Sequence, residues 1–186
     1  VINWENGGLK IKNFNGSTVR NEQFYFKKGV TWSKICSGNL SGRYSPETHM
    51  FDAVGLTCFT NNEAELYYLL AFMCSVVATL FVRMLNPTLS YTVGTISNIP
   101  WLFDVDKCKD VINLAKDNLL LAIQDWDSFE TSWDFQQHPL IRCVSFSRQQ
   151  IESDAEKHIK DIHYIEDAFT NWNNECNTRF SQLKSN

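Results

Sequence analysis

Short apolar stretches alternate with polar breaks along the first hundred residues. β-Branched and aromatic side chains predominate in these stretches, and several of them alternate with polar side chains at a period of two. That period puts every second side chain on one face and is typical of half-buried strands bounded by Gly, Asn and Ser. The pattern predicts strands at residues 8–14, 23–26, 30–35, 50–59 and 91–96.

One longer apolar stretch lies between these strands. Residues 66–82 contain no charged side chain, and their bulky side chains recur every three or four positions while small ones fill the opposite side. Two such faces are typical of a helix buried between a sheet and another element. Asn61-Asn62, before Glu63, supplies a suitable N-cap, and Pro87 ends the helix because it disfavours helical geometry at Asn86. A membrane span is the alternative, but a span needs roughly twenty apolar residues, so we expect a buried helix.

Beyond residue 101 the pattern changes to helical spacing. Residues 104–124 are predicted to form a helix, and the following connector is rich in rings: Trp126, Phe129, Trp133 and Phe135. Between 147 and 183, apolar side chains recur every three or four residues, close to a heptad repeat. Such a stripe requires a partner, which is the connector helix, another domain of a longer protein or a second copy.

These elements predict an α+β protein with a mixed sheet and a buried helix, followed by a helical, coiled-coil-like C-terminal region. We expect an α/β domain at 1–101, a connector helix with an aromatic linker at 102–146, and a long amphipathic helix at 147–186. A chain of 186 residues with 44% apolar residues is long enough and apolar enough to bury a core.

Charge is distributed unevenly along the chain. The net charge of −4 argues against a nucleic-acid binder when the chain is taken as a whole. The first fifty residues, however, hold seven Lys and Arg against three Asp and Glu, whereas residues 101–186 hold nine against fifteen. Phosphate binding needs local positive charge, so the N-terminal part is compatible with DNA and the C-terminal part disfavours it.

Motifs for catalysis or cofactor binding are missing from the sequence. There is no Asn-Pro-Pro-aromatic loop for a flipped adenine, no Gly-x-Gly or phosphate-cradling loop, and no nuclease arrangement of acids. The six cysteines and four histidines lack metal-ligand spacing, so no metal is expected. Without a visible secretory signal we expect free thiols in a cytoplasmic protein. The chain begins at Val1 and stops within a helical pattern, which indicates a fragment of a longer protein.

Two stretches resemble the C-terminal part of the adenine methyltransferases of BREX phage-defence systems, the PglX family. The first is KGVTWS (28–33) with RYSP (43–46) and FD (51–52), and the second is DWDSFETSWDF (125–135) with HPL (138–140). The stretches at 69–75, 85–88, 93–94 and 98–100 are more broadly similar to the recognition domains of type IIG enzymes and type I specificity subunits. The Cys74-Ser75 step departs from the family pattern, in which Asn-Ser is usual.

The resemblance implies that the parent protein is an N6-adenine DNA methyltransferase that uses S-adenosylmethionine. Its catalytic domain, with the cofactor, would precede Val1, and this chain would supply recognition of double-stranded DNA with no cofactor of its own. The implied partners are DNA, the parent's methyltransferase domain, and other defence proteins or a second copy bound through the C-terminal helix.

Candidate DNA contacts lie in two stretches of the N-terminal half. Phosphates require cations, and base edges require donors and acceptors. The candidates from the strand and loop region are Lys27, Lys28, Ser33, Lys34, Ser37, Ser41 and Arg43, and those from the loop after the long helix are Asn86, Thr88 and Tyr91. Arg43 is the foremost candidate, because a guanidinium binds guanine with two hydrogen bonds.

Several aromatic residues are assigned to packing. A Trp amid strand residues, such as Trp32, is usually part of a core. For the rings of the connector, packing between the recognition domain and the helix is favoured over base stacking, because acidic neighbours repel phosphate. The alternative to DNA recognition is an interaction module that binds other proteins of a defence complex through the seam at 147–183.

Overall fold

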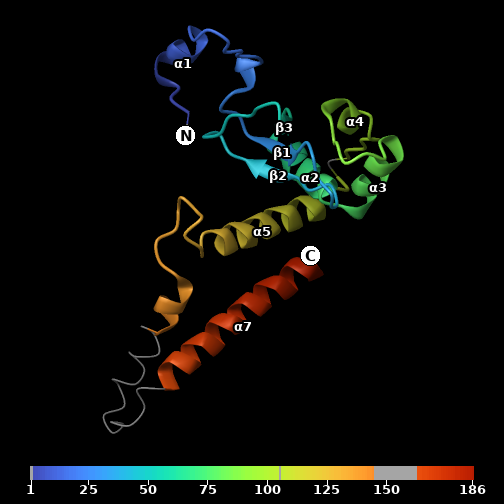
Figure 1. Ribbon diagram of the computed structural model, residues 1–186. Coiled ribbons are helices and arrows are strands. Elements are labelled where there is room, and N and C mark those ends of the chain that lie inside the picture. The colour runs from blue at the N-terminus through green and yellow to red at the C-terminus, as the bar shows by residue number, and fades with distance from the viewer. Residues whose placement is uncertain (1, 105, 145–162) are drawn as a thin grey trace. The chain divides into compact units, whose positions relative to one another are not determined.

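The computed structural model describes residues 2–104, 106–144 and 163–186. The chain divides into two compact units, Val1–Cys108 and Lys109–Asn186 (Figure 1). Strands and helices make up the first unit and helices the described part of the second, so the predicted α+β class is confirmed. The sequence placed the end of the first domain at Trp101, whereas the structure keeps residues 102–108 with the first unit.

The sheet of the first unit has three antiparallel strands. β1 (Gly29–Ser33) is the central strand, between β2 (Arg43–Ser45) and β3 (Gly55–Cys58). Thr31 of β1 pairs with Arg43 on one side and with Thr57 on the other. The strand predicted at 30–35 is confirmed as β1, and that predicted at 50–59 is confirmed over its last part as β3.

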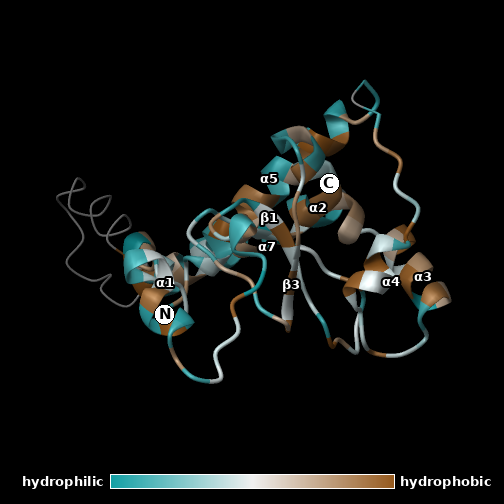
Figure 2. Cartoon of the chain, turned by 90° about the horizontal axis from the view of Figure 1, so that it is seen from above, coloured by the Kyte–Doolittle hydropathy of each residue, from teal (hydrophilic) through white to brown (hydrophobic). Residues whose placement is uncertain are grey.

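The long apolar stretch forms two helices rather than one. α2 (Glu63–Met73) and α3 (Val76–Leu85) meet at a bend of 71°. Ser75 makes the break, because its side chain accepts a hydrogen bond from the Ala78 amide and so begins a new helix. Figure 2 shows the hydrophobic colouring that α3 carries. The predicted N-cap at Asn62 is confirmed by its bond from the Glu65 amide, at 2.8 Å, and the helix ends before Asn86 as expected.

The core of the first unit lies between the sheet and these helices. Val30 and Trp32 point to it from β1, and Leu66, Leu70 and Met73 form the matching stripe on α2. After the bend the buried face changes, because Ala78, Thr79 and Val82 are buried while the bulky side chains Val76, Val77 and Leu80 are exposed. The single bulky stripe predicted from residue 66 to residue 81 is therefore wrong beyond the bend.

Gly42 allows close packing just before β2. A Cβ atom at this position would lie 3.0 Å from Met73 Cβ and 3.0 Å from Val30 Cγ1, which is tighter than ordinary van der Waals contact. A glycine therefore lets the chain approach the core before it turns outward at Arg43.

Two predicted strands near the N-terminus are wrong. Residues 8–14 fall within α1 (Glu5–Lys12) and the turn after it, and residues 23–26 lie largely in the short 3-10 helix η1 (Glu22–Phe24). The alternating pattern is short, and neither stretch has a strand of the described sheet beside it to pair with. Asn6, Gly7 and Gly8 instead adopt left-handed backbone angles at the start of α1, which Gly permits without strain.

The strand predicted at 91–96 is also wrong. This stretch leads into α4 (Val93–Ser97), whose N-cap Thr92 accepts a hydrogen bond from the Thr95 amide at 3.2 Å. Its β-branched composition favoured a strand, but the cap supplies a local alternative for the backbone amides. The residues before α4 instead form an isolated bridge, between Ile35 and Ser90, with the chain after β1.

The second unit contains an antiparallel helical hairpin (Figure 1). It is formed by α5 (Lys109–Trp126) and α7 (His163–Ser185), with a further helical stretch at 139–144. Side-chain contacts join the C-terminal part of α7 to the second half of α5: Arg179 contacts Asp125 at 3.4 Å and Asn186 contacts Asn118 at 2.9 Å. The helix predicted at 104–124 is confirmed with a later start. The one predicted at 147–183 is confirmed from residue 163, and residues 145–162 lie outside the described part.

Within the described residues, none of the helices alone is long and apolar enough to cross a membrane. α2 and α3 meet that criterion only when they are counted together across their bend.

Candidate nucleic-acid interface

Arg43 and Ser33 lie together on neighbouring strands. The Arg43 Nη2 atom donates a hydrogen bond to Ser33 Oγ at 3.1 Å. Arg43 is exposed, and Ser33 is half-buried at the end of β1. This contact orients the guanidinium while leaving its remaining N–H groups available to a ligand.

The structure brings together two stretches that are more than fifty positions apart in the sequence. Ile35 and Ser90 form a β-bridge, the Cys36 amide donates to the Leu89 carbonyl at 3.0 Å, and the Tyr91 amide donates to the Lys34 carbonyl at 2.6 Å. The loop after α3 therefore runs beside the chain that leaves β1. The candidates Lys34 and Ser37 of the first group are therefore adjacent in the fold to the second group, at residues 86–91.

The side-chain amide of Asn86 organises the loop after α3. Asn86 Nδ2 donates to the Ser90 carbonyl at 2.9 Å, and Asn86 Oδ1 accepts from the Thr88 amide at 3.0 Å and from the Thr88 hydroxyl at 2.7 Å. Asn86 is half-buried, whereas Thr88 is exposed at the tip. Asn86 thus shapes the loop, and Thr88 is the residue of the pair that faces solvent.

Tyr91 and Trp32 are buried under this surface. Tyr91 is only 3% exposed, and its hydroxyl donates to the Gly38 carbonyl at 3.1 Å. The Tyr91 carbonyl in turn accepts from Trp32 Nε1 at 2.9 Å. The assignment of Trp32 to the core is confirmed. Tyr91 supports the neighbouring loop from beneath, and its side chain is not accessible to a ligand.

A residue that the sequence analysis missed joins the same surface. Arg83 of α3 donates from Nη2 to Asn39 Oδ1 at 3.1 Å, beside the exposed residues Ser37 and Ser41. The loop is also anchored by the Leu40 amide, which donates to Thr79 Oγ1 at 3.2 Å. The signal in the sequence was the isolation of Arg83 as a single charge within the apolar stretch 66–85.

We call this region the loop surface. It consists of Ser33, Lys34, Ile35, Ser37, Asn39, Ser41, Arg43, Arg83, Thr88 and Leu89. It combines three cations with hydroxyl and amide groups, which are the side chains that hold phosphates and read base edges.

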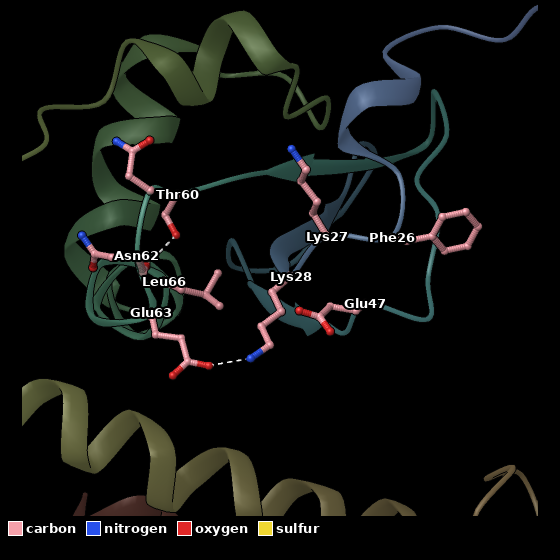
Figure 3. Close-up of a pocket in the computed structure, with 9 residues that line it drawn as sticks. Phe26, Lys27, Lys28, Glu47, Thr60, Asn62, Glu63 and Leu66 are labelled. Carbon is pink, nitrogen blue, oxygen red and sulfur yellow. Dashed lines mark hydrogen bonds and ion pairs between the residues drawn. The ribbon is translucent and has the colours of Figure 1, made fainter.

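Lys27 and Lys28 lie at the other end of β1, away from the loop surface. Lys28 Nζ contacts Glu63 Oε1 at 2.6 Å, and Figure 3 shows Lys27 pointing in the opposite direction. The hydrogen bond and charge of Glu63 raise the pKa of Lys28 above its usual value, so Lys28 remains a cation. Its charge is nevertheless partly neutralised by the partner. Lys27 is exposed, with its ammonium 5.3 Å from the Phe24 ring centroid.

A carboxylate lies next to the end of β1 that carries Ser33. Asp52 Oδ1 accepts hydrogen bonds from the Val54 amide at 2.8 Å and from the Gly55 amide at 2.5 Å, and Gly55 pairs with Ser33. These backbone donors hold the pKa of Asp52 below its usual value. Asp52 shapes the turn into β3, and its negative charge limits how closely a phosphate can approach there.

No cluster of three or more His, Cys, Asp or Glu side chains that could hold a metal ion is found in the part of the chain that the structure describes. The chemistry that the loop surface offers is that of binding through charge and hydrogen bonds.

No protein-family model matches the chain. The chain is 34% identical over 193 residues to the adenine-specific methyltransferase PglX of Lacticaseibacillus casei strain Zhang, an alignment that covers 100% of the chain and 15% of that protein. It is also 34% identical over 143 residues to the adenine-specific methyltransferase BrxX of Escherichia coli O9:H4 strain HS, which covers 76% of the chain and 12% of that protein. The chain therefore spans less than a sixth of the length of these curated relatives.

Proposed function

The chain is homologous to adenine-specific methyltransferases of the PglX and BrxX type, and on this basis we propose that it recognises the DNA target of such an enzyme. In this proposal the first unit holds double-stranded DNA against the loop surface, as recognition domains of type IIG enzymes and type I specificity subunits do. Transfer of the methyl group from S-adenosylmethionine to N6 of adenine takes place in another part of a longer phage-defence protein.

The observation that carries the proposal is the junction of the two loops. The bridge between Ile35 and Ser90 places Thr88 beside the chain that bears Lys34 and Ser37. A recognition surface needs phosphate-binding cations next to groups that can reach base edges. Sequence-distant residues of both kinds meet here on a rigid support of β1 and α3.

Arg43 is the residue expected to contribute most to base recognition. It is exposed, and the bond to Ser33 restricts its side chain, so less rotational freedom is lost on binding. A guanidinium that forms two hydrogen bonds to guanine discriminates against the wrong base by about 1–3 kcal/mol, which is roughly tenfold or more in affinity. Lys34 and Arg83 supply phosphate contacts on either side.

Fluorescence anisotropy with a mixed-sequence duplex tests the proposal directly. Binding by the whole chain should weaken steeply between low and moderate salt, because counterions are released from the phosphates. Arg43→Ala should reduce the affinity about tenfold. Lys10→Ala removes the same charge from an exposed position of α1 and should have little effect. Absence of binding at low salt, or equal effects of the two variants, would contradict the proposal.

A second candidate function is an interaction module, and the exposure of α7 favours it. Ile165, Phe169 and Phe180 are 54%, 52% and 57% exposed. Exposed apolar side chains that share one helix often mark a protein–protein interaction site, so they favour an interaction through the C-terminal helix. Sedimentation of the whole chain over a range of concentrations distinguishes self-association from a monomer that binds other proteins.

A further inference from the structure

The connector after α5 contains a turn built from residues 126–134, which we call the tryptophan turn. Its two serines face inward, since Ser128 and Ser132 are 9% and 8% exposed. Its two tryptophans face outward, since Trp126 and Trp133 are 59% and 87% exposed. This is the reverse of the usual preference, in which indole rings are buried and serines lie at the surface.

Hydrogen bonds to the two serines fix this arrangement. Ser128 Oγ donates to the Gln124 carbonyl at 2.7 Å, and Ser132 Oγ donates to Asp127 Oδ1 at 2.6 Å. Ser132 Oγ also accepts from the Asp134 amide at 3.1 Å. These hydrogen bonds form a polar network on the buried side of the turn. Because the serines occupy that side, the indoles lie on the exposed side.

Some rings of the aromatic connector make contacts within the second unit. Phe129 contacts His138 with ring centroids 6.4 Å apart, and His138 contacts Trp172 of α7 at 4.9 Å. Trp126 and Trp133 have no such ring contact among those found in the described residues. Packing of these two indoles between the recognition domain and the helix stays a prediction.

Negative charge surrounds the exposed indoles. Residues 118–141 contain four Asp and Glu and no Lys or Arg. Glu130 and Asp134 are exposed beside Trp133, whereas Asp125, which precedes Trp126, is paired with Arg179. A cation over an indole face is attracted by the ring, and nearby carboxylates add to this attraction. The turn thus combines both groups that bind Arg and Lys side chains.

We propose that the tryptophan turn is a docking surface for a basic segment of a separate protein. Arg or Lys side chains of that segment lie on the faces of Trp133 and Trp126 and pair with Glu130 and Asp134, and apolar side chains between them cover the rest of the indoles. DNA does not fit this surface, because its phosphates would meet the carboxylates of Glu130 and Asp134. The proposal does not rest on DNA recognition by the first unit.

Binding of designed peptides to the whole chain tests this proposal. The probe is a fluorescein-labelled peptide that repeats Arg-Leu-Ala, compared with repeats of Arg-Ser-Ala and Glu-Leu-Ala, in buffer of physiological ionic strength. The Arg-Leu-Ala peptide should bind most tightly, and Trp133→Ala should weaken it about tenfold, because exposed aromatic anchors dominate such interfaces. Glu130→Gln with Asp134→Asn should weaken it as well. These side chains are exposed, and unchanged circular dichroism and thermal melting confirm that the variants fold.

Matched variants separate docking from general attraction to an acidic protein. Leu102→Ala removes a side chain that is 84% exposed, and Asp106→Asn with Asp117→Asn removes two charges elsewhere. Neither should change peptide binding. Equal binding of Arg-Ser-Ala, an unaltered affinity in Trp133→Ala, or equal losses in the matched variants would overturn the proposal. A dimer that dissociates in Trp133→Ala would also overturn it, because a second copy would then occupy the surface.

Discussion

Asn86 and Arg43 show how polar side chains of one surface divide between support and contact. Both the Nδ2 and the Oδ1 atoms of Asn86 form hydrogen bonds within the loop after α3. Arg43 makes one hydrogen bond, to Ser33, and is otherwise exposed. Substitution at the first is therefore expected to act through the shape of the loop, and substitution at the second through the contact with DNA.

Tyr91→Phe tests the support that Tyr91 gives to the loop surface. The change removes the hydroxyl that donates to the Gly38 carbonyl and leaves the buried ring in place. We expect a loss of about 1 kcal/mol in the free energy of unfolding, measured by urea denaturation, since one intramolecular hydrogen bond is lost. DNA affinity should fall less than in Arg43→Ala, because Tyr91 makes no contact of its own. A larger loss of affinity than in Arg43→Ala would contradict this role.

Glu63→Gln tests whether Lys28 takes part in DNA binding. The Glu63 carboxylate is 2.6 Å from Lys28 Nζ and partly neutralises it. Removing that charge should raise DNA affinity about twofold at low salt, a size that matches an exposed ion pair. Glu5→Gln, which changes an exposed carboxylate of α1, is the control. If the affinity does not change, Lys28 is a surface charge that does not contact DNA.

At the scale of elements, the bend between α2 and α3 determines where the loop surface lies. A straight helix would carry Arg83 along the axis of α2 and away from Asn39, whereas the 71° bend brings α3 beside the loop that follows β1. The small side chains Ala78 and Thr79 make this possible, because they let α3 approach the core closely. The Cys74-Ser75 step thus determines where Arg83 lies in the loop surface.

Ser75→Ala tests the bend. The change removes the cap of α3, whose side-chain oxygen accepts from the Ala78 amide at 3.1 Å. Loss of an N-cap costs about 1 kcal/mol, which we expect to see as a lower midpoint in thermal or urea denaturation. Ser37→Ala, at an exposed loop position, should leave the midpoint unchanged. A midpoint for Ser75→Ala equal to that of the unaltered chain would show that the cap does not hold the bend.

Capping and pairing explain which elements the sequence could predict. The strand at 30–35 was correct because it rests on a run of β-branched residues. The N-cap was correct because an amide acceptor, Asn62, precedes the acids of the first helical turn. The strands predicted at 8–14 and 91–96 failed because alternation alone does not provide a partner strand, and Thr92 offers a helical cap instead. The burial of Tyr91 and the contribution of Arg83 depend on long-range contacts that no local pattern contains.

At the scale of the whole molecule, the uneven charge agrees with the different partners that we propose for the two units. The loop surface in the first unit carries Lys34, Arg43 and Arg83, whereas the second unit displays the acidic tryptophan turn. Phosphate binding by three cations gives a slope of roughly −3 for the logarithm of the binding constant against the logarithm of salt concentration. We expect Arg83→Ala to make that slope shallower by about one, as measured by anisotropy. A slope that Arg83→Ala leaves unchanged would exclude Arg83 from the phosphate contacts.

Backbone amide hydrogen exchange of the whole chain, with and without saturating duplex DNA, is the most direct test of recognition through the loop surface. We expect DNA to slow exchange at residues 33–43 and 86–90, where the two loops meet. Exchange at the tryptophan turn, residues 126–134, should not change. Slower exchange at the turn with no change in the two loops would contradict it, since the acidic unit and not the loop surface would then contact DNA.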